Sequence, residues 1–225
     1  ALFAIVQFLA IKEYFFLLHK INPEQKYSSI LQSLVHLFGI LALLFSTSLL
    51  GNEQTYLPTL LCLPACILLI EALSKNGTVS KAFQALSALL YICLPIALLI
   101  LMREKSLLLP LGLILLIWIN DTMAYIVGSF IGKTPFSSIS PKKTWEGTIG
   151  GALLTIIAAG VWGYFSYYYN IQDWIILSLC ASVAGTLGDL FESKLKRLAG
   201  VKDSGSFMPG HGGALDRFDS LLIAT

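Results

Sequence analysis

Charged residues are scarce in this sequence. Of its 225 residues, 15 are Lys or Arg and 13 are Asp or Glu, whereas 56% are hydrophobic. Soluble domains carry about 25% charged residues, against 12% here. The composition therefore excludes an ordinary soluble protein, and the net charge of +2 is too small to indicate nucleic-acid binding.

Cysteine is also rare, and no CxxC pair is present. Cys62, Cys66, Cys93 and Cys180 all lie within apolar runs. This placement does not suggest a disulfide framework or a zinc site. We interpret the four side chains as packing or lipid-facing residues.

Long apolar runs dominate instead, and a transmembrane helix needs about 20 mostly apolar residues. The predicted spans are 1–18, 30–50, 56–73, 82–102, 107–127, 148–168 and 172–190, and an eighth starts near 219. The pattern predicts an all-α, polytopic integral membrane protein with about seven to eight transmembrane helices. We expect a single membrane domain over 1–225, with N-terminal helices at 1–106, a motif-bearing region at 107–225 and a truncated final helix.

The basic residues are unevenly distributed between the loops. If the spans alternate across the bilayer, Lys12 lies within the first span, only Arg103 and Lys105 lie on one side, and the other 12 Lys and Arg lie on the opposite side. The positive-inside rule makes that basic side cytoplasmic. Two long polar segments, 128–147 and 191–218, lie on the same side. We therefore expect a polar active site that faces the cytoplasm.

Two aspartates interrupt or end apolar runs. Asp121 follows the run from Leu107 to Asn120, where an uncompensated carboxylate would be costly. It is either a helix-end residue that reaches interfacial water or a ligand for metal or substrate. Asp189 raises the same question, and its neighbouring glycines would let a helix or ligand approach the backbone.

The segment that starts at Gly128 and continues through Gly132-Lys133-Thr134 resembles a P-loop with one residue too few. It also follows a membrane helix instead of a strand, so we do not expect P-loop geometry. Its Gly and Lys content still suits phosphate contact.

A second polar segment, 140–147, places Lys142 and Lys143 just before a Gly150-Gly151 pair that opens a helix. Free backbone N–H groups and the helix dipole favour negative charge at a helix start. The two lysines are therefore candidates for holding a polyanion. The alternative is that they anchor lipid headgroups.

The densest polar segment is 189–219, in which Asp216 and Asp219 are three residues apart. On a helix they would share a face and approach one cation. Mg²⁺ takes one or two carboxylates and completes its shell with water and phosphate oxygens. Carboxylates, basic residues and Gly-rich loops together predict phosphoryl or nucleotidyl transfer; a structural salt-bridge network is the alternative. His211, between two glycines, is either a ligand-contacting or an ordinary turn residue.

These residues resemble a known signature. Ser193-x-x-Lys196-Arg197, Lys202-Asp203 and Pro209-x-His211-Gly-Gly-x-x-Asp216-Arg217-x-Asp219 are similar to the signature of phosphatidate cytidylyltransferases, also called CDP-diacylglycerol synthases. Asp121-Thr-x-Ala-Tyr125, Gly132-Lys133 and Ser140-Pro-Lys-Lys-Thr-x-Glu146-Gly147 resemble the upstream segments of that family in the same order. The resemblance is strongest over 120–220, whereas the first hundred residues match only as hydrophobic helices.

The resemblance implies a multi-helix enzyme, usually homodimeric, in the bacterial inner membrane with a cytoplasmic active site. Its partners would be CTP, phosphatidic acid and the bilayer, with no nucleic acid. The phosphate of phosphatidic acid would attack the α-phosphorus of CTP, and pyrophosphate would leave. The implied cofactor is Mg²⁺, with a second metal ion that is either divalent or K⁺.

The resemblance also assigns roles to residues. Asp189 and Asp216 would hold the metal, with Asp219 and Asp121 as further ligands. The residues expected to contact the triphosphate and the lipid phosphate are Lys142, Lys143, Lys196, Arg197, Lys202, His211 and Arg217. Further substrate-binding positions are Lys133, Ser140, Thr144, Glu146 and Ser193.

Two other functions remain open at this point. The same machinery could act on another lipid phosphate. A cation or phosphate transporter would instead need polar groups across the whole membrane, and the far-side loops are nearly featureless. Enzymes that consume CDP-diacylglycerol carry a DGxxAR motif, which this sequence lacks.

Overall fold

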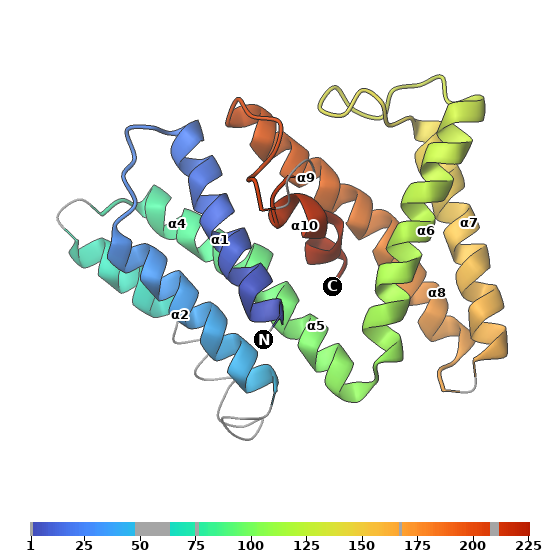
Figure 1. Ribbon diagram of the computed structural model, residues 1–225, viewed down its shortest axis with the longest axis horizontal. Helices are drawn as coiled ribbons and strands as arrows, with labels where there is room; N and C mark the ends of the chain where they lie inside the picture. The colour runs from blue at the N-terminus through green and yellow to red at the C-terminus, as the bar shows by residue number, and fades with distance from the viewer. Residues whose placement is uncertain (1, 48–63, 75–76, 167, 208–211) are drawn as a thin grey trace. The chain divides into compact units, whose positions relative to one another are not determined.

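The protein is predominantly helical in the part that the structure describes. The computed structural model describes residues 2–47, 64–74, 77–166, 168–207 and 212–225 (Figure 1). Within these ranges the only extended pairing is an isolated bridge between Pro135 and Thr144. Six of the described helices are long and apolar enough to cross a membrane, and Pro64–Leu73 is a shorter apolar helix. The prediction of an all-α polytopic membrane protein is confirmed.

The chain divides into two compact units. Unit 1 contains Ala1–Glu104 and Leu198–Arg217, and unit 2 contains Lys105–Arg197 and Phe218–Thr225. The boundary near residue 105 coincides with the predicted change from the N-terminal helices to the motif-bearing region. Part of the signature, however, belongs to unit 1 together with the N-terminal helices. The single-domain organisation stays a prediction.

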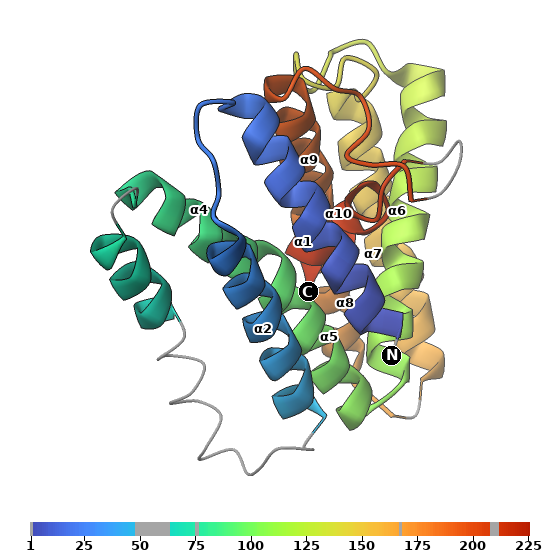
Figure 2. The ribbon, with the colours of Figure 1, turned by 60° about the vertical axis from the view of Figure 1, so that its left-hand side comes forward.

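Unit 1 is built on three long helices that pack side by side (Figures 1 and 2). They are α1 (Leu2–Ile21), α2 (Ser29–Ser46) and a continuous helix made of α4 (Val79–Ala88), the π-helical turn η1 (Leu89–Cys93) and α5 (Leu94–Lys105). Ser28 caps α2, because its Oγ accepts a hydrogen bond from the backbone N–H of Leu31 at 3.1 Å. The hydroxyls of Tyr14 and Ser87, 2.6 Å apart, link α1 to α4.

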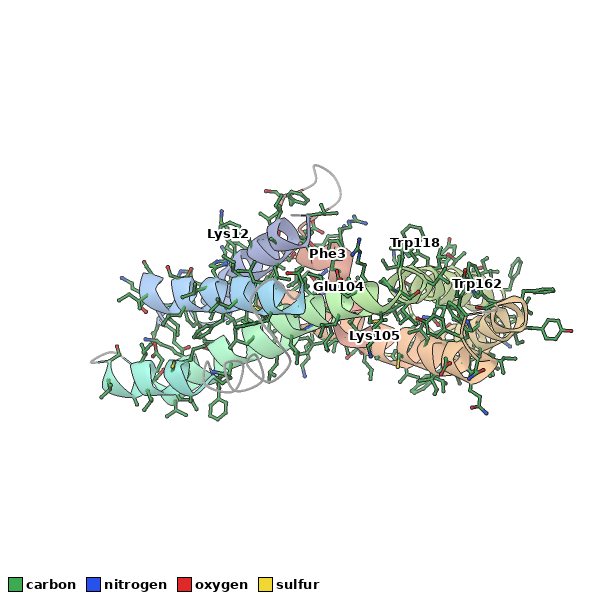
Figure 3. The ribbon with its side chains drawn as sticks, turned by 90° about the horizontal axis from the view of Figure 1, so that it is seen from below. Phe3, Lys12, Glu104, Lys105, Trp118 and Trp162 are labelled. Carbon is green, nitrogen blue, oxygen red and sulfur yellow. The ribbon has the colours of Figure 1, made fainter. Side chains whose placement is uncertain are left out.

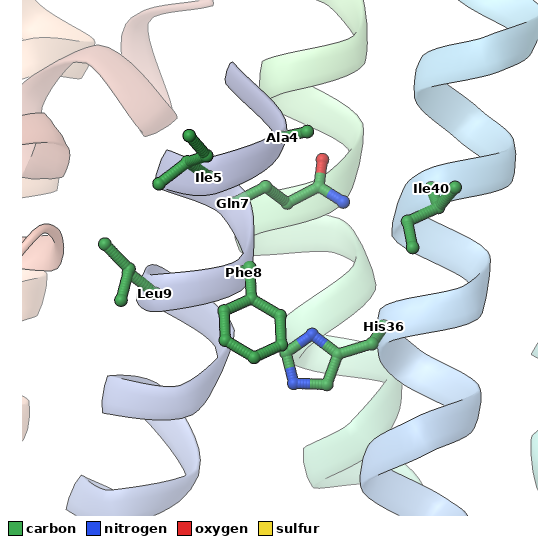
Figure 4. Close-up of a pocket in the computed structure, with 7 residues that line it drawn as sticks. All are labelled: Ala4, Ile5, Gln7, Phe8, Leu9, His36 and Ile40. Atoms are coloured by element: carbon green, nitrogen blue, oxygen red, sulfur yellow. The ribbon is translucent and has the colours of Figure 1, made fainter. Parts of the chain in front are cut away.

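A cavity of about 270 Å³ lies between α1 and α2 in unit 1 (Figure 4). Its lining is mostly apolar, and Gln7 and His36 are its polar members. Phe8 and His36 stack with their ring centroids 4.6 Å apart. No carboxylate or primary amine lines this cavity, so its chemistry does not suit a metal-bound polyphosphate.

Unit 2 contains the helices that carry most of the predicted site. They are α6 (Leu108–Ile131), α7 (Trp145–Phe165), a continuous helix made of α8 (Ile171–Leu179), the π-helical turn η2 (Cys180–Ala184) and α9 (Gly185–Leu198), and finally α10 (Leu215–Ala224), whose first residues belong to unit 1.

Helices α6 and α7 make the most extensive contact in unit 2 (Figure 1). Small residues permit this contact, because the buried positions of α7 recur every fourth residue: Gly147, Gly151, Thr155, Ala159 and Gly163. A Cβ atom added at Gly151 would lie 2.8 Å from Ala124 Cβ on α6. Such small-residue stripes let membrane helices approach closely. The Gly150-Gly151 pair therefore has a packing role.

Large apolar side chains cover the outer surface of unit 2. Trp118 on α6 is 64% exposed and Trp162 on α7 is 48% exposed (Figure 3). Exposed side chains of this kind would be unusual on a soluble domain of this size but match a surface surrounded by lipid.

Two helices continue furthest beyond their predicted C-terminal ends. The predicted span 107–127 continues to Ile131, and the predicted span 172–190 continues to Leu198. The second extension arises because Glu192 and Lys196 pair across one turn, and Gly200, with φ of 69°, is the first residue suited to a left-handed helix end. The predicted loop residues between 191 and 198 therefore lie on a helix.

Candidate active site

An ion pair between a loop and a helix forms the centre of the candidate site in unit 2. The ammonium group of Lys143, from the loop between α6 and α7, contacts the carboxylate Oδ2 of Asp189 on α9. The two side chains are 30% and 27% exposed, so the pair is partly removed from water. The structure therefore brings together two residues that the sequence analysis assigned to the same site.

The loop that supplies Lys143 is held by backbone hydrogen bonds. The N–H of Phe136 donates to the carbonyl of Lys143 at 2.7 Å, and the N–H of Trp145 donates to the carbonyl of Thr134 at 2.9 Å. The rings of Phe136 and Trp145 pack edge to face with centroids 4.6 Å apart. Lys143 thus projects from an ordered turn.

Glu146 closes the base of this loop. Its carboxylate accepts hydrogen bonds from the backbone N–H groups of Lys133 and Thr134, each at 3.2 Å, and from Thr134 Oγ1 at 2.8 Å. Thr144 caps α7, because its Oγ1 accepts from the N–H of Gly147 at 3.2 Å. The structure thus gives Glu146 and Thr144 local structural roles, and their predicted contacts with substrate stay predictions.

Two further aspartates lie beside the ion pair. Asp121 on α6 is within electrostatic range of Lys143 and Asp189. Asp219 on α10, a helix that is not among the six candidate spans, is hydrogen-bonded to Asp189 through the side chains. Burial and the Asp189 carboxylate raise the pKa of Asp219 from 3.8 to about 7, because both oppose its negative charge. A cation bound at this site would therefore stabilise the ionised carboxylates.

Gly188 explains how Asp219 reaches Asp189. A Cβ atom added at Gly188 would lie 2.5 Å from the backbone oxygen of Asp219. Helices α9 and α10 touch at this point, as expected from the glycines that flank Asp189 in the sequence. A larger residue would separate the two carboxylates.

Lys196 is a second cation on α9, one turn after Glu192. Lys196 Nζ is 2.5 Å from the carboxylate of Glu192, which is fully buried. Lys196 also interacts electrostatically with Asp219. Its ammonium group therefore belongs to the same charged cluster as Lys143.

The other predicted residues of unit 2 are at least partly accessible to solvent. Lys133, Lys142 and Arg197 are exposed, and Ser193 is half-buried on α9. The carbonyl of Ser140 accepts a hydrogen bond from the N–H of Lys143 at 3.0 Å. His211 lies outside the described residues, so its predicted role is not tested.

The remaining part of the signature belongs to unit 1. Asp216 Oδ2 accepts hydrogen bonds from the N–H of Ser204 at 2.8 Å, from Ser204 Oγ at 2.9 Å and from the N–H of Gly213 at 2.7 Å. Lys202 and Arg217 are exposed. Because Asp216 and Asp189 belong to different units, a metal shared between them stays a prediction.

Two polar residues of interest were not singled out from the sequence. Glu13 on α1 is 8% exposed and accepts hydrogen bonds from Ser204 and from two backbone N–H groups. Asn120 is 3% exposed and hydrogen-bonds to Asp121. Only their positions in the sequence could have indicated Glu13 and Asn120, because a polar or charged residue inside an apolar run is a functional candidate by default.

The donor set suits Mg²⁺. No three His, Cys, Asp or Glu side chains within the described ranges converge as a preformed metal cage. Mg²⁺ does not need one, because it usually binds one or two carboxylates and keeps water and phosphate oxygens as its other ligands. The adjacent carboxyl groups of Asp189 and Asp219, which interact through their side chains, provide such a pair.

Comparison with known proteins decides the family. A model of the cytidylyltransferase family matches residues 1–225, which is the whole sequence. The chain belongs to the cytidylyltransferase family. This membership agrees with the motif resemblance, and it places the Lys143–Asp189 cluster within a family that is named for cytidylyl transfer.

Several curated members of the family are similar to this chain, and each is named phosphatidate cytidylyltransferase. The protein of Staphylococcus aureus strain COL is 40% identical over 171 residues, which are 74% of this chain and 65% of that protein. The protein of Staphylococcus haemolyticus is 47% identical over 112 residues, 48% of this chain and 43% of that protein. The chain thus spans just under two thirds of the length of the longer-matching relative.

Proposed function

We propose that this chain is a phosphatidate cytidylyltransferase, which transfers CMP from CTP to phosphatidic acid and yields CDP-diacylglycerol and pyrophosphate. The observation that carries the proposal is the Lys143–Asp189 ion pair with Asp219 and Asp121 beside it. Cations and paired carboxylates at one helix end are suited to a metal-bound triphosphate. The names of the relatives supply the nucleotide and the lipid.

The reaction is opposed by charge repulsion, because an anionic lipid phosphate must approach a polyanionic nucleotide. One oxygen of the lipid phosphate forms a bond to the α-phosphorus, while the bond from the α-phosphorus to the bridging oxygen of the β-phosphate breaks. Lys143 and Lys196 neutralise phosphate oxygens on both partners and on the leaving pyrophosphate. No general base is required, since the attacking phosphate oxygen is already ionised near neutral pH.

The metal position in this proposal is the Asp189–Asp219 pair. Asp189 and Asp219 would hold Mg²⁺ there, and the ion would supply positive charge to offset the charge that develops on the leaving group. Asp121 and Asp216 are proposed as further ligands, with a second ion, divalent or K⁺, as an additional cofactor. Lys142, Arg197, Lys202, His211 and Arg217 are proposed to contact the phosphates, while Lys133, Ser140, Thr144, Glu146 and Ser193 line the nucleotide.

The location and assembly of the enzyme are part of the same proposal. The uneven distribution of Lys and Arg supports a bacterial inner-membrane enzyme whose charged cluster faces the cytoplasm. That face is where CTP is available. A homodimer is proposed from the family resemblance.

The test is incorporation of labelled CTP into chloroform-soluble lipid by purified protein. We expect labelled lipid only when phosphatidic acid and Mg²⁺ are both present. Label that appears only with a different lipid phosphate would replace the acceptor and retain the transferase. A folded preparation that labels no lipid phosphate would overturn the proposed reaction.

A further inference from the structure

Glu13 is a buried carboxylate whose contacts all lie far away in the sequence. It is on α1, eight residues before the end of that helix at Ile21, and it is 8% exposed. Its Oε1 accepts a hydrogen bond from the N–H of Ala214 at 2.9 Å, and its Oε2 accepts one from the N–H of Leu215 at 2.8 Å. Both donors are within unit 1, at the start of α10.

The same carboxylate fixes the first part of the signature loop. Ser204 is fully buried, and its hydroxyl lies 3.0 Å from Glu13 Oε2 and 2.9 Å from Asp216 Oδ2. One hydroxyl proton can satisfy only one of these acceptors at a time. Ser204 therefore joins Glu13 to Asp216, a residue of the signature.

Two glycines make room for Glu13. A Cβ atom added at Gly205 would lie 2.5 Å from Glu13 Oε1, and one added at Gly213 would overlap the Glu13 carboxylate, with Cδ at 2.5 Å. Neither glycine has a positive φ, so the close approach to Glu13 is the reason that no side chain fits. The glycine after Gly212 in the signature is thus explained by a residue on the first membrane helix.

Glu13 also occupies the place where an anion would otherwise bind. The first N–H groups of a helix and its dipole attract negative charge. At α10 these N–H groups are already satisfied by Glu13 within the protein. In the proposed function, a phosphate near this end of α10 would contact side chains such as Arg217, which follows the residues that Glu13 holds.

We propose that Glu13 is a positioning residue for the transfer reaction: it clamps Ser204 and the start of α10 at Ala214 and Leu215 to α1 and so sets the positions of the signature residues next to these contacts. These are Lys202 and Asp203 before the clamp and Asp216 and Arg217 after it. The inference rests on the proposed function for its catalytic consequence, but the clamp itself is a property of unit 1.

The main variant is Glu13→Gln, which keeps the size of the side chain but replaces one acceptor oxygen with an NH₂ group that faces a backbone N–H. Loss of a hydrogen bond to a charged group of this kind raises KM for CTP, phosphatidic acid or both by about tenfold. Reduced stability alone would lower the number of active molecules and leave KM unchanged. Glu24→Gln, an exposed acid in the same unit, is the matched control and retains wild-type kinetics.

A double-mutant cycle separates clamping from general damage. Gly213→Ala pushes a methyl group into Glu13 and raises KM in the same way as Glu13→Gln. In a Glu13→Ala background the methyl group has space, so Glu13→Ala/Gly213→Ala is no worse than Glu13→Ala alone. If the loss in the double variant equals the sum of the losses in the two single variants, a direct contact between these residues is contradicted.

Hydrogen exchange keeps the inference independent of the reaction. In Glu13→Gln, the amides of Ser204, Ala214 and Leu215 exchange faster than in the wild type, whereas those of α2 do not. An inactive wild type with this exchange pattern would leave the clamp intact and overturn the proposed function. An active wild type whose Glu13→Gln variant shows unchanged KM values and unchanged exchange would overturn the clamp.

Discussion

Lys143 and Asp189 neutralise each other as an ion pair, and in the proposed function each would exchange this partner for another when substrate binds. A metal ion is a stronger partner for the Asp189 carboxylate, and a phosphate oxygen is a suitable partner for the Lys143 ammonium. The ion pair thus keeps two charges compensated in a partly buried site until the metal nucleotide replaces it. An unpaired charge there would carry a desolvation cost.

Replacing Asp189 with Asn tests this exchange at one atom. Asp189→Asn removes the charge that holds both Lys143 and the metal, so turnover falls by about 100-fold or more while the protein stays folded. Asp173→Asn makes the same change at the other end of the same continuous helix and retains activity. Lipid labelling and thermal unfolding of both variants check the prediction, and near-normal activity of Asp189→Asn would remove it from the metal site.

The Asp219 carboxyl predicts how metal binding depends on pH. Burial and Asp189 raise its pKa from 3.8 to about 7, so in the metal-free protein it holds a proton that the unfolded chain has lost. That proton stabilises the metal-free fold below pH 7, and its contribution is lost as the pH rises through about 7. Mg²⁺ must displace the proton, so its apparent affinity falls by up to about tenfold per unit below pH 7.

Thermal unfolding without nucleotide measures this linkage. The increase in Tm caused by a fixed Mg²⁺ concentration is larger at pH 8 than at pH 6, because a ligand with a lower Kd stabilises the folded state more at the same concentration. In Asp219→Asn the increase is smaller and independent of pH. Equal increases at both pH values in the wild type would contradict a proton shared between Asp189 and Asp219.

Sequence predicted the charged residues of the cluster better than their surroundings. Asp121 and Asp189 stood out because charge in or beside an apolar run is costly, and Lys143 stood out because it lies just before a helix start. Glu13 carries the same signal, but its partners lie about 190 to 200 residues away and no local pattern reports them. The partners of Glu146, by contrast, are close in the sequence. Its local structural role was still not predicted, because it depends on a turn geometry that the motif does not specify.

At the scale of elements, the contact between α6 and α7 depends on the small-residue stripe of α7. Gly151→Ala places a methyl group 2.8 Å from atoms of Ala124 and lowers the free energy of unfolding by about 1–3 kcal/mol. Gly160→Ala on the same helix has no atom within 4 Å of its new Cβ and is neutral or slightly stabilising. Thermal unfolding in detergent compares the two, and equal effects would exclude the stripe as the packing surface.

The helices themselves were predictable, and their ends were less so. Hydropathy detects the apolar part of a helix, whereas α9 continues through polar residues to Leu198, supported by the Glu192–Lys196 pair. The π-helical turns η1 and η2 leave no mark in the hydropathy pattern, because they alter hydrogen bonding without changing polarity. The predicted span 56–73 is described only over Pro64–Leu73.

For the whole molecule, the uneven distribution of Lys and Arg predicts which loops face the cytoplasm. In a background without the native cysteines, Ser138→Cys, between α6 and α7, reacts with a membrane-impermeant maleimide only in inverted vesicles. Tyr168→Cys, between α7 and α8 and 80% exposed, reacts only from the outside. Labelling of both positions from the same side would mean that α7 does not cross the membrane.

The length of the continuous helix Ile171–Leu198 has a consequence for how two dissimilar substrates meet. Its 28 residues extend about 42 Å at 1.5 Å per residue, whereas the hydrocarbon core is about 30 Å thick. A helix perpendicular to the membrane would therefore extend about 12 Å beyond the hydrocarbon core. The polar end of this helix carries Glu192 and Lys196. In the proposed function, this extension would place the transfer reaction at the headgroup boundary, with the nucleotide in water and the diacyl tails in the hydrocarbon core.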